Sequence, residues 1–350
     1  MTTQAAGAPV LVPVLANHRL DESKLVAWLS ANLEGFAGPC TIRQFQGGQS
    51  NPTYHLQTPD AAYVLRKKPP GKLLPSAHAV DREFAVQRAL AGSGVPVPKM
   101  HVLCTDDSII GTMFYVMDAI PGRVFPDRLL PGCTAGERAA MYDDMNRVMA
   151  ALHRVDYTEV GLDSFGRPQG YIARQIDRWS RQYIASNMGD APEMEKLAAW
   201  LPAHLPDTEM SAIVHGDFRL GNLIFHPTEP RVVAVLDWEL ATLGHPLSDL
   251  AYNCIPWHTP PEESGIAGAE TPGIPTEHDY AAAYYRRMGL TDPPDLDFYI
   301  VFSLFRWAAI AAGVYRRALD GNAADAEAGE VGSKYKTLAR RAWELAQKGG

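Results

Sequence analysis

The feature that most constrains this 350-residue chain is a predicted β-hairpin with polar side chains at both of its ends. Two short apolar runs, residues 222–225 and 232–236, flank the turn-forming sequence His226-Pro-Thr-Glu-Pro230. This pattern is typical of two strands joined by a turn. Such a hairpin places Asn222, at its start, near Asp237, at its end. Asp217 lies five positions before Asn222, so we expect the three side chains to come together.

These residue types suit phosphoryl transfer from ATP. Mg²⁺ prefers oxygen ligands and is usually held by one or two protein groups together with phosphates and waters. Asn222 and Asp237 supply such oxygens and are the predicted metal ligands. The attacking hydroxyl needs a proton acceptor within hydrogen-bond reach, and Asp217 is the predicted catalytic base. Either Asp or Asn alone is more often a turn residue, but their joint occurrence favours an active site.

The motif His215-Gly-Asp-x4-Asn222, followed by Leu236-Asp-Trp238, resembles the catalytic and metal motifs of the aminoglycoside phosphotransferase-like branch of the protein-kinase fold. Two further segments, Val64-Leu-Arg through Val80-Asp-Arg-Glu83 and Glu239 through Tyr252, look like the kinase-like domain that in some proteins is fused to an acyl-CoA dehydrogenase. The resemblance covers roughly residues 25–320.

This resemblance implies an α+β fold of the bilobal protein-kinase type. The expected parts are a tail over residues 1–20, a nucleotide-binding lobe over 21–118 and a mainly helical catalytic and substrate-binding lobe over 119–350. The small lobe is expected to hold a five-stranded antiparallel sheet and one helix. Its predicted strands are 41–45, 53–57, 62–66, 99–104 and 112–117, and the predicted helices of the whole chain are 21–35, 79–91, 135–153, 169–187, 192–203, 276–288, 295–318 and 324–347.

The resemblance also assigns a phosphate-positioning pair. Arg66 matches the strand cation that contacts the α- and β-phosphates, and Glu83 matches its acidic partner on the next helix. Many relatives have lysine at this strand position, so the arginine is a departure with a different hydrogen-bonding geometry. Lys67 is the alternative cation. Side chains alternate along a strand, so only one of the two reaches the nucleotide site.

Two connecting segments are predicted to complete the nucleotide site. Glycines in the loop at residues 47–51 let backbone N–H groups approach phosphate oxygens, although a simple turn is the alternative. The segment at 117–122 matches the interlobe linker, whose backbone takes the adenine edge in such folds. The predicted contacts in these segments are Gly47, Gly48, Ser50, Asn51, Asp118 and Ile120.

Two residues are predicted to support the catalytic loop. His215 follows the apolar Val214 and is expected to orient the loop, with a purely structural role as an equal alternative. Asp249, in His245-Pro-Leu-Ser-Asp249, matches a helix-start aspartate that braces the catalytic loop in the family.

Composition restricts the class of protein. The net charge of −8 and the pI of about 5.8 disfavour a nucleic-acid or membrane-surface binder. The four cysteines, at positions 40, 104, 133 and 254, show no metal-site spacing and suit reduced thiols in the cytosol. The most apolar stretch, 299–315, contains Arg306, is followed by Arg316 and Arg317, and is too short and too charged for a membrane span. We therefore expect a soluble, cytoplasmic protein.

The acceptor is the least constrained part of the prediction. Residues 256–276 form a Pro- and Gly-rich loop, either a substrate lid or a solvated excursion. Glu239 and Arg306 are the candidate substrate contacts, and Arg306 stands in an apolar stretch where an unpaired charge is costly. The resemblance favours a hydroxyacyl-CoA. The alternatives are an aminoglycoside, choline-like or sugar-like acceptor, or a nucleotide-binding module without catalysis.

Overall fold

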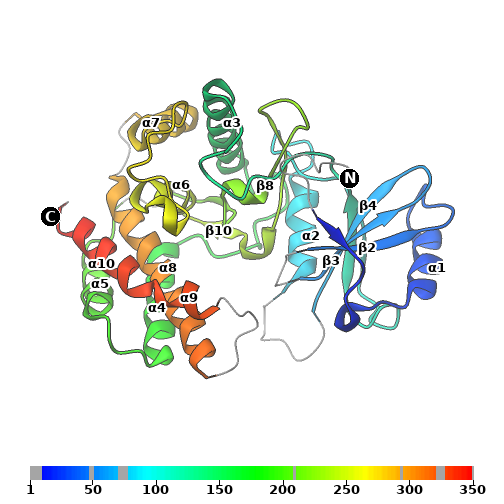
Figure 1. Ribbon diagram of the computed structural model, residues 1–350, viewed down its shortest axis with the longest axis horizontal. Helices are drawn as coiled ribbons and strands as arrows, with labels where there is room; N and C mark the ends of the chain where they lie inside the picture. Colours follow the sequence, from blue (N-terminus) through cyan, green and yellow to red (C-terminus); the bar gives the residue numbers. More distant parts are fainter. Residues whose placement is uncertain are drawn as a thin grey trace. The chain divides into compact units, whose positions relative to one another are not determined.

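The computed structural model describes residues 10–46, 51–69, 78–207, 210–291, 295–320 and 328–348, and Figure 1 shows the order of its elements. Internal contacts divide the chain into two compact units. The first comprises Met1–Ala151, Tyr157–Asp163 and Arg219–Ala241, and the second Leu152–Asp156, Ser164–Phe218 and Thr242–Gly350. These units interleave along the chain, unlike the predicted lobes 21–118 and 119–350.

The first unit is built on an antiparallel sheet of six strands, one more than predicted. The additional strand is β1 (Leu11–Val12), which pairs with Phe45 and Gln44 at the edge of the sheet. A segment assigned to the N-terminal tail is therefore part of the fold. The sheet order is β1, β2 (Thr41–Phe45), β3 (Thr53–Gln57), β4 (Ala62–Lys67), β6 (Phe114–Asp118) and β5 (Met100–Cys104).

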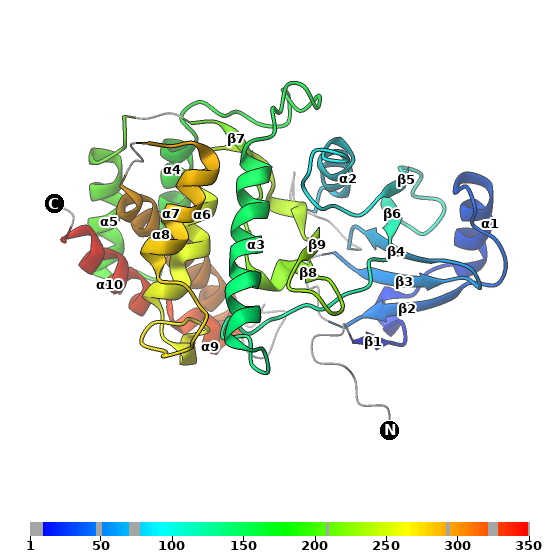
Figure 2. The same cartoon turned by 90° about the horizontal axis from the view of Figure 1, so that it is seen from above.

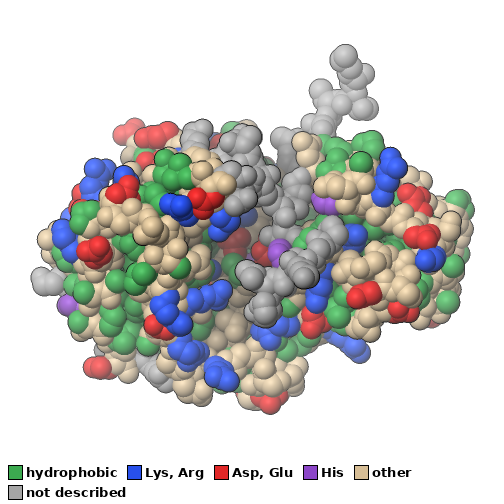
Figure 3. Space-filling model, turned by 90° about the horizontal axis from the view of Figure 1, so that it is seen from below, with side chains coloured by type: hydrophobic (Ala, Val, Ile, Leu, Met, Phe, Trp, Pro, Cys, Tyr) green, Lys and Arg blue, Asp and Glu red, His purple; other side chains and the backbone are tan. Residues whose placement is uncertain are grey.

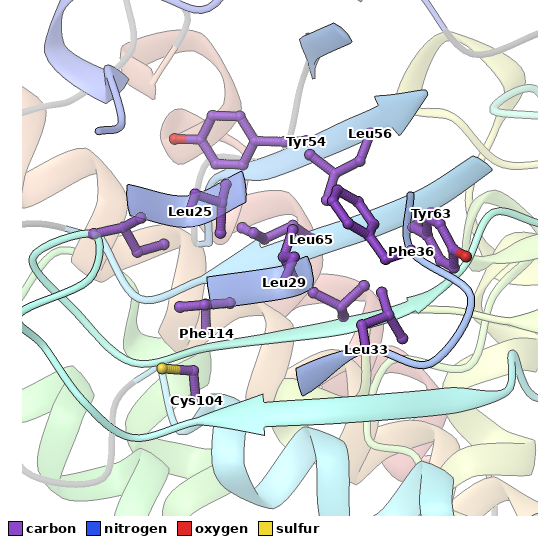
Figure 4. Close-up of a cluster of buried hydrophobic side chains, with 12 residues drawn as sticks. Leu25, Leu29, Leu33, Phe36, Tyr54, Leu56, Tyr63, Leu65, Cys104 and Phe114 are labelled. Carbon is purple, nitrogen blue, oxygen red and sulfur yellow. The ribbon is translucent and has the colours of Figure 1, made fainter. Parts of the chain in front are cut away.

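Two helices pack on opposite faces of this sheet because side chains alternate along each strand. On one face, Leu25 and Leu29 of α1 (Glu22–Asn32) pack against Tyr63 and Leu65 of β4, as the close-up in Figure 4 shows. On the other face, Phe84 of α2 (Val80–Ala89) packs with apolar residues of β4 and β6. The residues of β4 between those of the α1 face, among them Arg66, therefore lie on the α2 side.

The predicted hairpin is present and belongs to the first unit. It consists of β8 (Leu223–Phe225) and β9 (Val232–Val235), which are antiparallel. The chain after β6 is fastened to it, because the backbone N–H of Arg123 donates to Phe225 O at 2.8 Å and the reverse bond is also 2.8 Å. Gly122 allows this approach, since a Cβ there would lie 2.3 Å from Phe225 O. α3 (Ala135–His153) follows this connection.

The second unit is mainly helical, as predicted, and its helices are seen from another direction in Figure 2. A short antiparallel pair, β7 (Ala212–Val214) and β10 (Thr242–Gly244), leads into the catalytic-loop motif. The predicted helix 324–347 is divided into two, and residues 324–327 lie outside the described part. The helices are α4 (Tyr171–Ser186), α5 (Pro192–Ala203), α6 (Leu247–Cys254), α7 (Glu277–Met288), α8 (Leu296–Leu319), α9 (Ala328–Ser333) and α10 (Tyr335–Ala346).

α8 is the central helix of this unit and is longer than the apolar stretch predicted from the sequence. With 24 residues and a mean hydropathy of 1.5 in its most apolar window, it is long and apolar enough to cross a membrane. The sequence-based judgement that the stretch is too short was therefore wrong. In the structure, 72% of that window is buried. α8 packs against α4, α6, α9 and α10, and a core helix of a folded domain passes the same length and hydropathy test.

Candidate active site

The first unit brings Arg66 together with three carboxylates. Its Nε lies 2.9 Å from Glu83 Oε2, and its Nη2 lies 2.6 Å from Asp237 Oδ1. Glu239, predicted as a substrate contact, has Oε2 3.9 Å from the same Nη2. A guanidinium presents its donors in a fixed planar fork, so one side chain can contact several carboxylates. The predicted pair Arg66–Glu83 is thus in contact and is extended to the predicted metal ligand Asp237.

Glu83 is the most buried member of this group, with 1% of its side chain exposed. Asn51 Nδ2 donates to its Oε1 at 2.8 Å, and the Tyr115 hydroxyl donates to its Oε2 at 3.1 Å. Burial raises the pKa of Glu83 to about 7, although Arg66 and the Tyr115 hydrogen bond oppose this shift. Burial would lower the pKa of Arg66, but the surrounding acidic groups, Glu83 first, raise it instead. We conclude that Arg66 stays charged.

The two predicted metal ligands lie on adjoining ends of the hairpin. The backbone N–H of Leu236 donates to Asn222 O at 2.8 Å, which links the position before Asp237 to Asn222. Asp237 has φ of 67°, a left-handed conformation that is unusual for a residue other than glycine and recurs at functional positions. Its carboxylate and the Asn222 amide are hard oxygen donors, which fits Mg²⁺ completed by phosphates and waters. Among the described residues, no group of three or more His, Cys, Asp or Glu side chains could hold a metal on its own.

A cavity of about 650 Å³ in the first unit adjoins these groups. Its wall is largely apolar, which suits a nucleotide base and small-molecule sites in general. Arg66, Asn222 and Asp237 line it together with Asp118 and Ile120, the two predicted linker contacts. Residues of the wall that sequence reasoning missed are Leu11, Phe45, His55, Val64, Met117, Ile224 and Leu236.

The backbone of the linker distinguishes its two predicted contacts. The N–H of Asp118 donates to Lys99 O at 3.0 Å, and that of Ala119 donates to Ala62 O at 3.2 Å. Within the described part of the chain, no backbone hydrogen bond engages the N–H of Ile120. Ile120 therefore keeps a donor at the cavity wall, whereas the N–H of Asp118 is committed to the sheet.

Other predicted nucleotide contacts have different outcomes. Gly47, Gly48 and Ser50 lie outside the described residues. Asn51 is fully buried, and its side chain contacts Glu83 and the His78 ring (3.1 Å). Its amide therefore holds the helix carboxylate in place. Lys67 is 4% exposed and follows Arg66 on the opposite face of β4, where burial lowers the pKa of its ammonium.

In the second unit, β7 leads directly into the loop that carries the predicted base. Asp249, on α6, accepts hydrogen bonds from the backbone N–H of His215 at 2.6 Å and of Gly216 at 2.9 Å. The buried His153 ring lies between Asp249 (3.3 Å) and the Tyr284 hydroxyl (2.7 Å). Although burial opposes the shift, hydrogen bonds and charge from the histidines lower the pKa of Asp249. Its contacts are those of the bracing role predicted from sequence.

The side chain of Asp217 is held from the same helix. The Tyr252 hydroxyl donates to Asp217 Oδ1 at 2.6 Å, and Asn253 Nδ2 donates to Phe218 O at 2.9 Å. Sequence reasoning missed both residues. The available signal was their spacing, since positions three and four residues after Asp249 share its face of a helix. Thus α6 contacts the loop through three side chains, at Asp249, Tyr252 and Asn253.

Arg306, the second candidate substrate contact, also meets this loop. Its Nη2 donates to Gly216 O at 2.9 Å, and its guanidinium carbon lies 5.7 Å from the centroid of Trp179 and 5.8 Å from that of Tyr252. Its side chain does not pair with an internal carboxylate of the described residues, one of the possibilities for a charge in this apolar helix.

Comparison with known proteins agrees with this geometry. The model of the phosphotransferase enzyme family matches residues 41–290. The chain belongs to this family. Acyl-CoA dehydrogenase family member 10 of Mus musculus is 45% identical over 350 residues, which cover 98% of this chain and 33% of the mouse protein. Family member 11 of Homo sapiens is 42% identical and is covered to 46%, against 99% of this chain. The chain thus spans a third to a half of these relatives, and the predicted resemblance is confirmed.

Solved structures of family members and of more distant proteins show the same fold. A candidate aminoglycoside phosphotransferase from Ralstonia eutropha has a TM-score of 0.88 and 48% identity, with 94% of this chain and 99% of that chain covered. A choline kinase from Cryptosporidium parvum has a TM-score of 0.65 at 13% identity, with 94% and 97% covered. At that identity the likeness concerns the fold alone, and it confirms the predicted kinase-like α+β class.

Proposed function

We propose that this chain is an ATP- and Mg²⁺-dependent kinase that phosphorylates a hydroxyl group of a small-molecule metabolite. The proposal rests above all on the contacts that connect Glu83, Arg66 and Asp237 beside an apolar cavity. Phosphoryl transfer depends mainly on positioning and on stabilising phosphate charge. A chain of this family with a cation, an amide and a carboxylate gathered at one end of a cavity has the groups that this chemistry needs.

In this proposal the first unit binds the nucleotide. The base would lie against the apolar wall, with the N–H of Ile120 as a donor to its edge. Arg66 would contact the phosphates while Glu83 holds its guanidinium in place. Asn222 and Asp237 would hold Mg²⁺, which supplies positive charge against the phosphate oxygens.

The second unit would then supply the base. Asp217 would accept the proton of the acceptor hydroxyl, and the Tyr252 hydroxyl at 2.6 Å would hold its carboxylate in one orientation. Asp249 and Arg306 would fix the backbone around it, because they bond Gly216 from two sides, at its N–H and at its carbonyl. A base held by several elements is pre-organised for in-line attack.

For the acceptor we propose a hydroxyacyl-CoA. The supporting observation is the identity of 42–45% to segments of proteins named as acyl-CoA dehydrogenase family members. A kinase domain that shares a chain with a dehydrogenase would act on the same acyl carrier. The alternative acceptors are an aminoglycoside, choline or a sugar, and the experiment below includes all of them.

The experiment measures MgATP binding and ATP consumption for the wild type and three variants. The panel holds 3- and 4-hydroxyacyl-CoAs, an aminoglycoside, choline and sugars. We expect Asp217→Ala to bind MgATP normally and lose turnover, and Asp237→Ala to lose Mg²⁺-dependent binding. Asp60→Ala, a change at an exposed carboxylate of the first unit, is the control and should change neither.

Three results would count against the proposal in different ways. Wild-type protein that binds no MgATP would refute the kinase assignment. Full turnover by Asp217→Ala would refute its role as base. MgATP binding without any phosphorylated product across the panel would favour a nucleotide-binding module without catalysis.

A further inference from the structure

Several charged side chains of this protein form ion pairs at its surface. On the face drawn in Figure 3, basic and acidic side chains are intermixed over the surface. Arginines of the second unit illustrate the pattern, since Arg316 pairs with Asp320 at 2.9 Å and Arg341 pairs with Glu263. Arg306 differs from both. It lies in the middle of α8, is only partly exposed, and has no carboxylate partner among the residues that the structure describes.

The surroundings hold the Arg306 guanidinium in place without neutralising it. Its Nη2 donates to Gly216 O. The ring centroids of Trp179 and Tyr252 lie 5.7 and 5.8 Å from its guanidinium carbon. Its Nε is buried and has no hydrogen-bond partner in the described part of the chain. A guanidinium carries five N–H donors, and among the described residues Arg306 makes one hydrogen bond, to Gly216 O. Within the described part of the chain, the Arg306 guanidinium therefore keeps N–H donors and a positive charge that no carboxylate offsets.

This unneutralised charge belongs to the same cluster as the proposed base. Tyr252 contacts both groups, because its ring lies near the Arg306 guanidinium and its hydroxyl donates to Asp217. The carbonyl that Arg306 binds is that of Gly216, the residue before Asp217. All of these residues belong to the second unit.

A partly buried charge without a counter-charge is costly, and aromatic faces offset only part of that cost. We propose that Arg306 is an acceptor-binding residue that takes an oxyanion of the substrate, either a carboxylate or a phosphate. This inference deepens the proposed function and rests on it. An anionic acceptor is repelled by the Asp217 carboxylate, and Arg306 offsets that repulsion. The same cation disfavours a polycationic acceptor such as an aminoglycoside.

A simpler role for Arg306 is to hold the catalytic loop through Gly216 O alone. The two roles differ in their dependence on acceptor charge. A structural clamp affects the turnover of every acceptor alike and lowers the melting temperature. An oxyanion site affects the KM of anionic acceptors and leaves the KM of a neutral acceptor of the same shape unchanged.

The test uses three acceptors that share one hydroxylated chain. They are 3-hydroxybutyrate, which carries a carboxylate, 3-hydroxybutyramide, which is neutral, and 3-hydroxybutyryl-CoA, which carries phosphates. ATP consumption is measured for wild type, Arg306→Gln and the control Arg178→Gln. Arg178 is exposed and lies 5.1 Å from the ring of the same Trp179, so the control removes a neighbouring cation from the same aromatic side chain.

We expect Arg306→Gln to raise the KM of an anionic acceptor at least tenfold more than the KM of the amide, with MgATP affinity unchanged. Loss of the bond to Gly216 O lowers kcat for all three acceptors alike and does not affect this difference. The anion that responds identifies the source, carboxylate or phosphate. Binding is measured independently of turnover, by ligand-observed NMR with 3-hydroxybutyrate, 3-hydroxybutyryl-CoA and inorganic phosphate. Arg306→Gln should abolish the signal that wild type and Arg178→Gln show.

The proposal is overturned if wild type binds none of the three anions, or if Arg306→Gln impairs the amide as strongly as the anions. Either result leaves the proposed kinase function standing when wild type consumes ATP with a neutral acceptor. Absence of MgATP binding, in contrast, removes the proposed function itself, and anion binding lost in Arg306→Gln would still support the oxyanion site.

Discussion

The choice between Arg66 and Lys67 as the phosphate-contacting cation gives the sharpest test of the nucleotide site. The two residues are adjacent in β4 and point to opposite faces of the sheet. Arg66 contacts Glu83 and Asp237 and lines the cavity, whereas Lys67 has no ion pair among the described residues. Replacing each by methionine removes one positive charge and keeps a long apolar side chain.

The expected magnitudes follow from these contacts. Arg66→Met leaves Glu83, 1% exposed, without its cation, and breaking a buried pair costs about 3–5 kcal/mol of folding stability. Loss of a hydrogen bond between charged groups costs about 1.5–3 kcal/mol, so we expect MgATP affinity to fall about 10- to 150-fold. Lys67→Met removes an unpaired buried charge. Its stability should be unchanged or higher, because burial already disfavours the ammonium.

The assay combines isothermal titration with MgATP and thermal melting at pH 8, where Glu83 is mostly ionised given its pKa of about 7. Lys68→Met is a control on the same segment, since the Lys68 ammonium lies a long 3.8 Å from the Asp81 carboxylate. The reasoning is refuted if Lys67→Met loses MgATP affinity while Arg66→Met keeps it. Equal losses in both variants would show that sheet integrity, and not phosphate contact, is being measured.

Three further changes test other contacts. Tyr252→Phe removes the hydroxyl that donates to Asp217, so kcat should fall about 10- to 150-fold in steady-state assays with MgATP affinity unchanged. Glu83 has a pKa raised from 4.5 to about 7, so its contribution to stability, present below about pH 4.5, should be lost as pH rises to 7; melting curves should show that slope, about 3 kcal/mol, in wild type and not in Glu83→Gln. Gly122→Ala forces a Cβ to 2.3 Å from Phe225 O and should lower the melting temperature, whereas Gly136→Ala, with open space in α3, should raise it slightly.

Much of the fold could be predicted from sequence because the local signals agree. The hairpin at residues 222–236 combines two apolar runs with turn residues, and the helix predicted at 21–35 begins at Asp21, whose carboxylate accepts from the Lys24 N–H. The helix at 192–203 begins with a proline in its first turn. β1 was missed because a two-residue edge strand has no periodicity, and its pairing with β2 is a tertiary event. The helix predicted at 295–318 agrees with α8 to within one residue at each end, because its apolar residues are bounded by charged ones.

The residues of the candidate site likewise fall into those that the sequence predicts and those that only the structure shows. Asp217, Asn222 and Asp237 stand at motif spacing, so the sequence alone predicts them. The contacts that hold them are made by residues without any motif, such as Tyr115 on Glu83 and Tyr252 on Asp217. A tyrosine in a strand or helix is usually a packing residue, and only the partner of its hydroxyl shows otherwise.

Arg66 and Arg306 show why a charge must be judged by its partners. In the sequence, Arg66 is assigned by its match to a family motif, whereas Arg306 is marked only by the apolar residues around it. In the structure, Arg66 has three carboxylates within 3.9 Å, which fix its guanidinium at the end of the cavity. Arg306 has a carbonyl and two aromatic rings, which fix its position and leave its charge uncompensated. Arg66, whose charge is neutralised by carboxylates, is suited to orient MgATP, because Mg²⁺ already offsets part of the phosphate charge. Arg306, whose charge no carboxylate of the described residues offsets, is suited to bind an anion. This difference in charge compensation separates the proposed nucleotide-binding role of Arg66 from the proposed acceptor-binding role of Arg306.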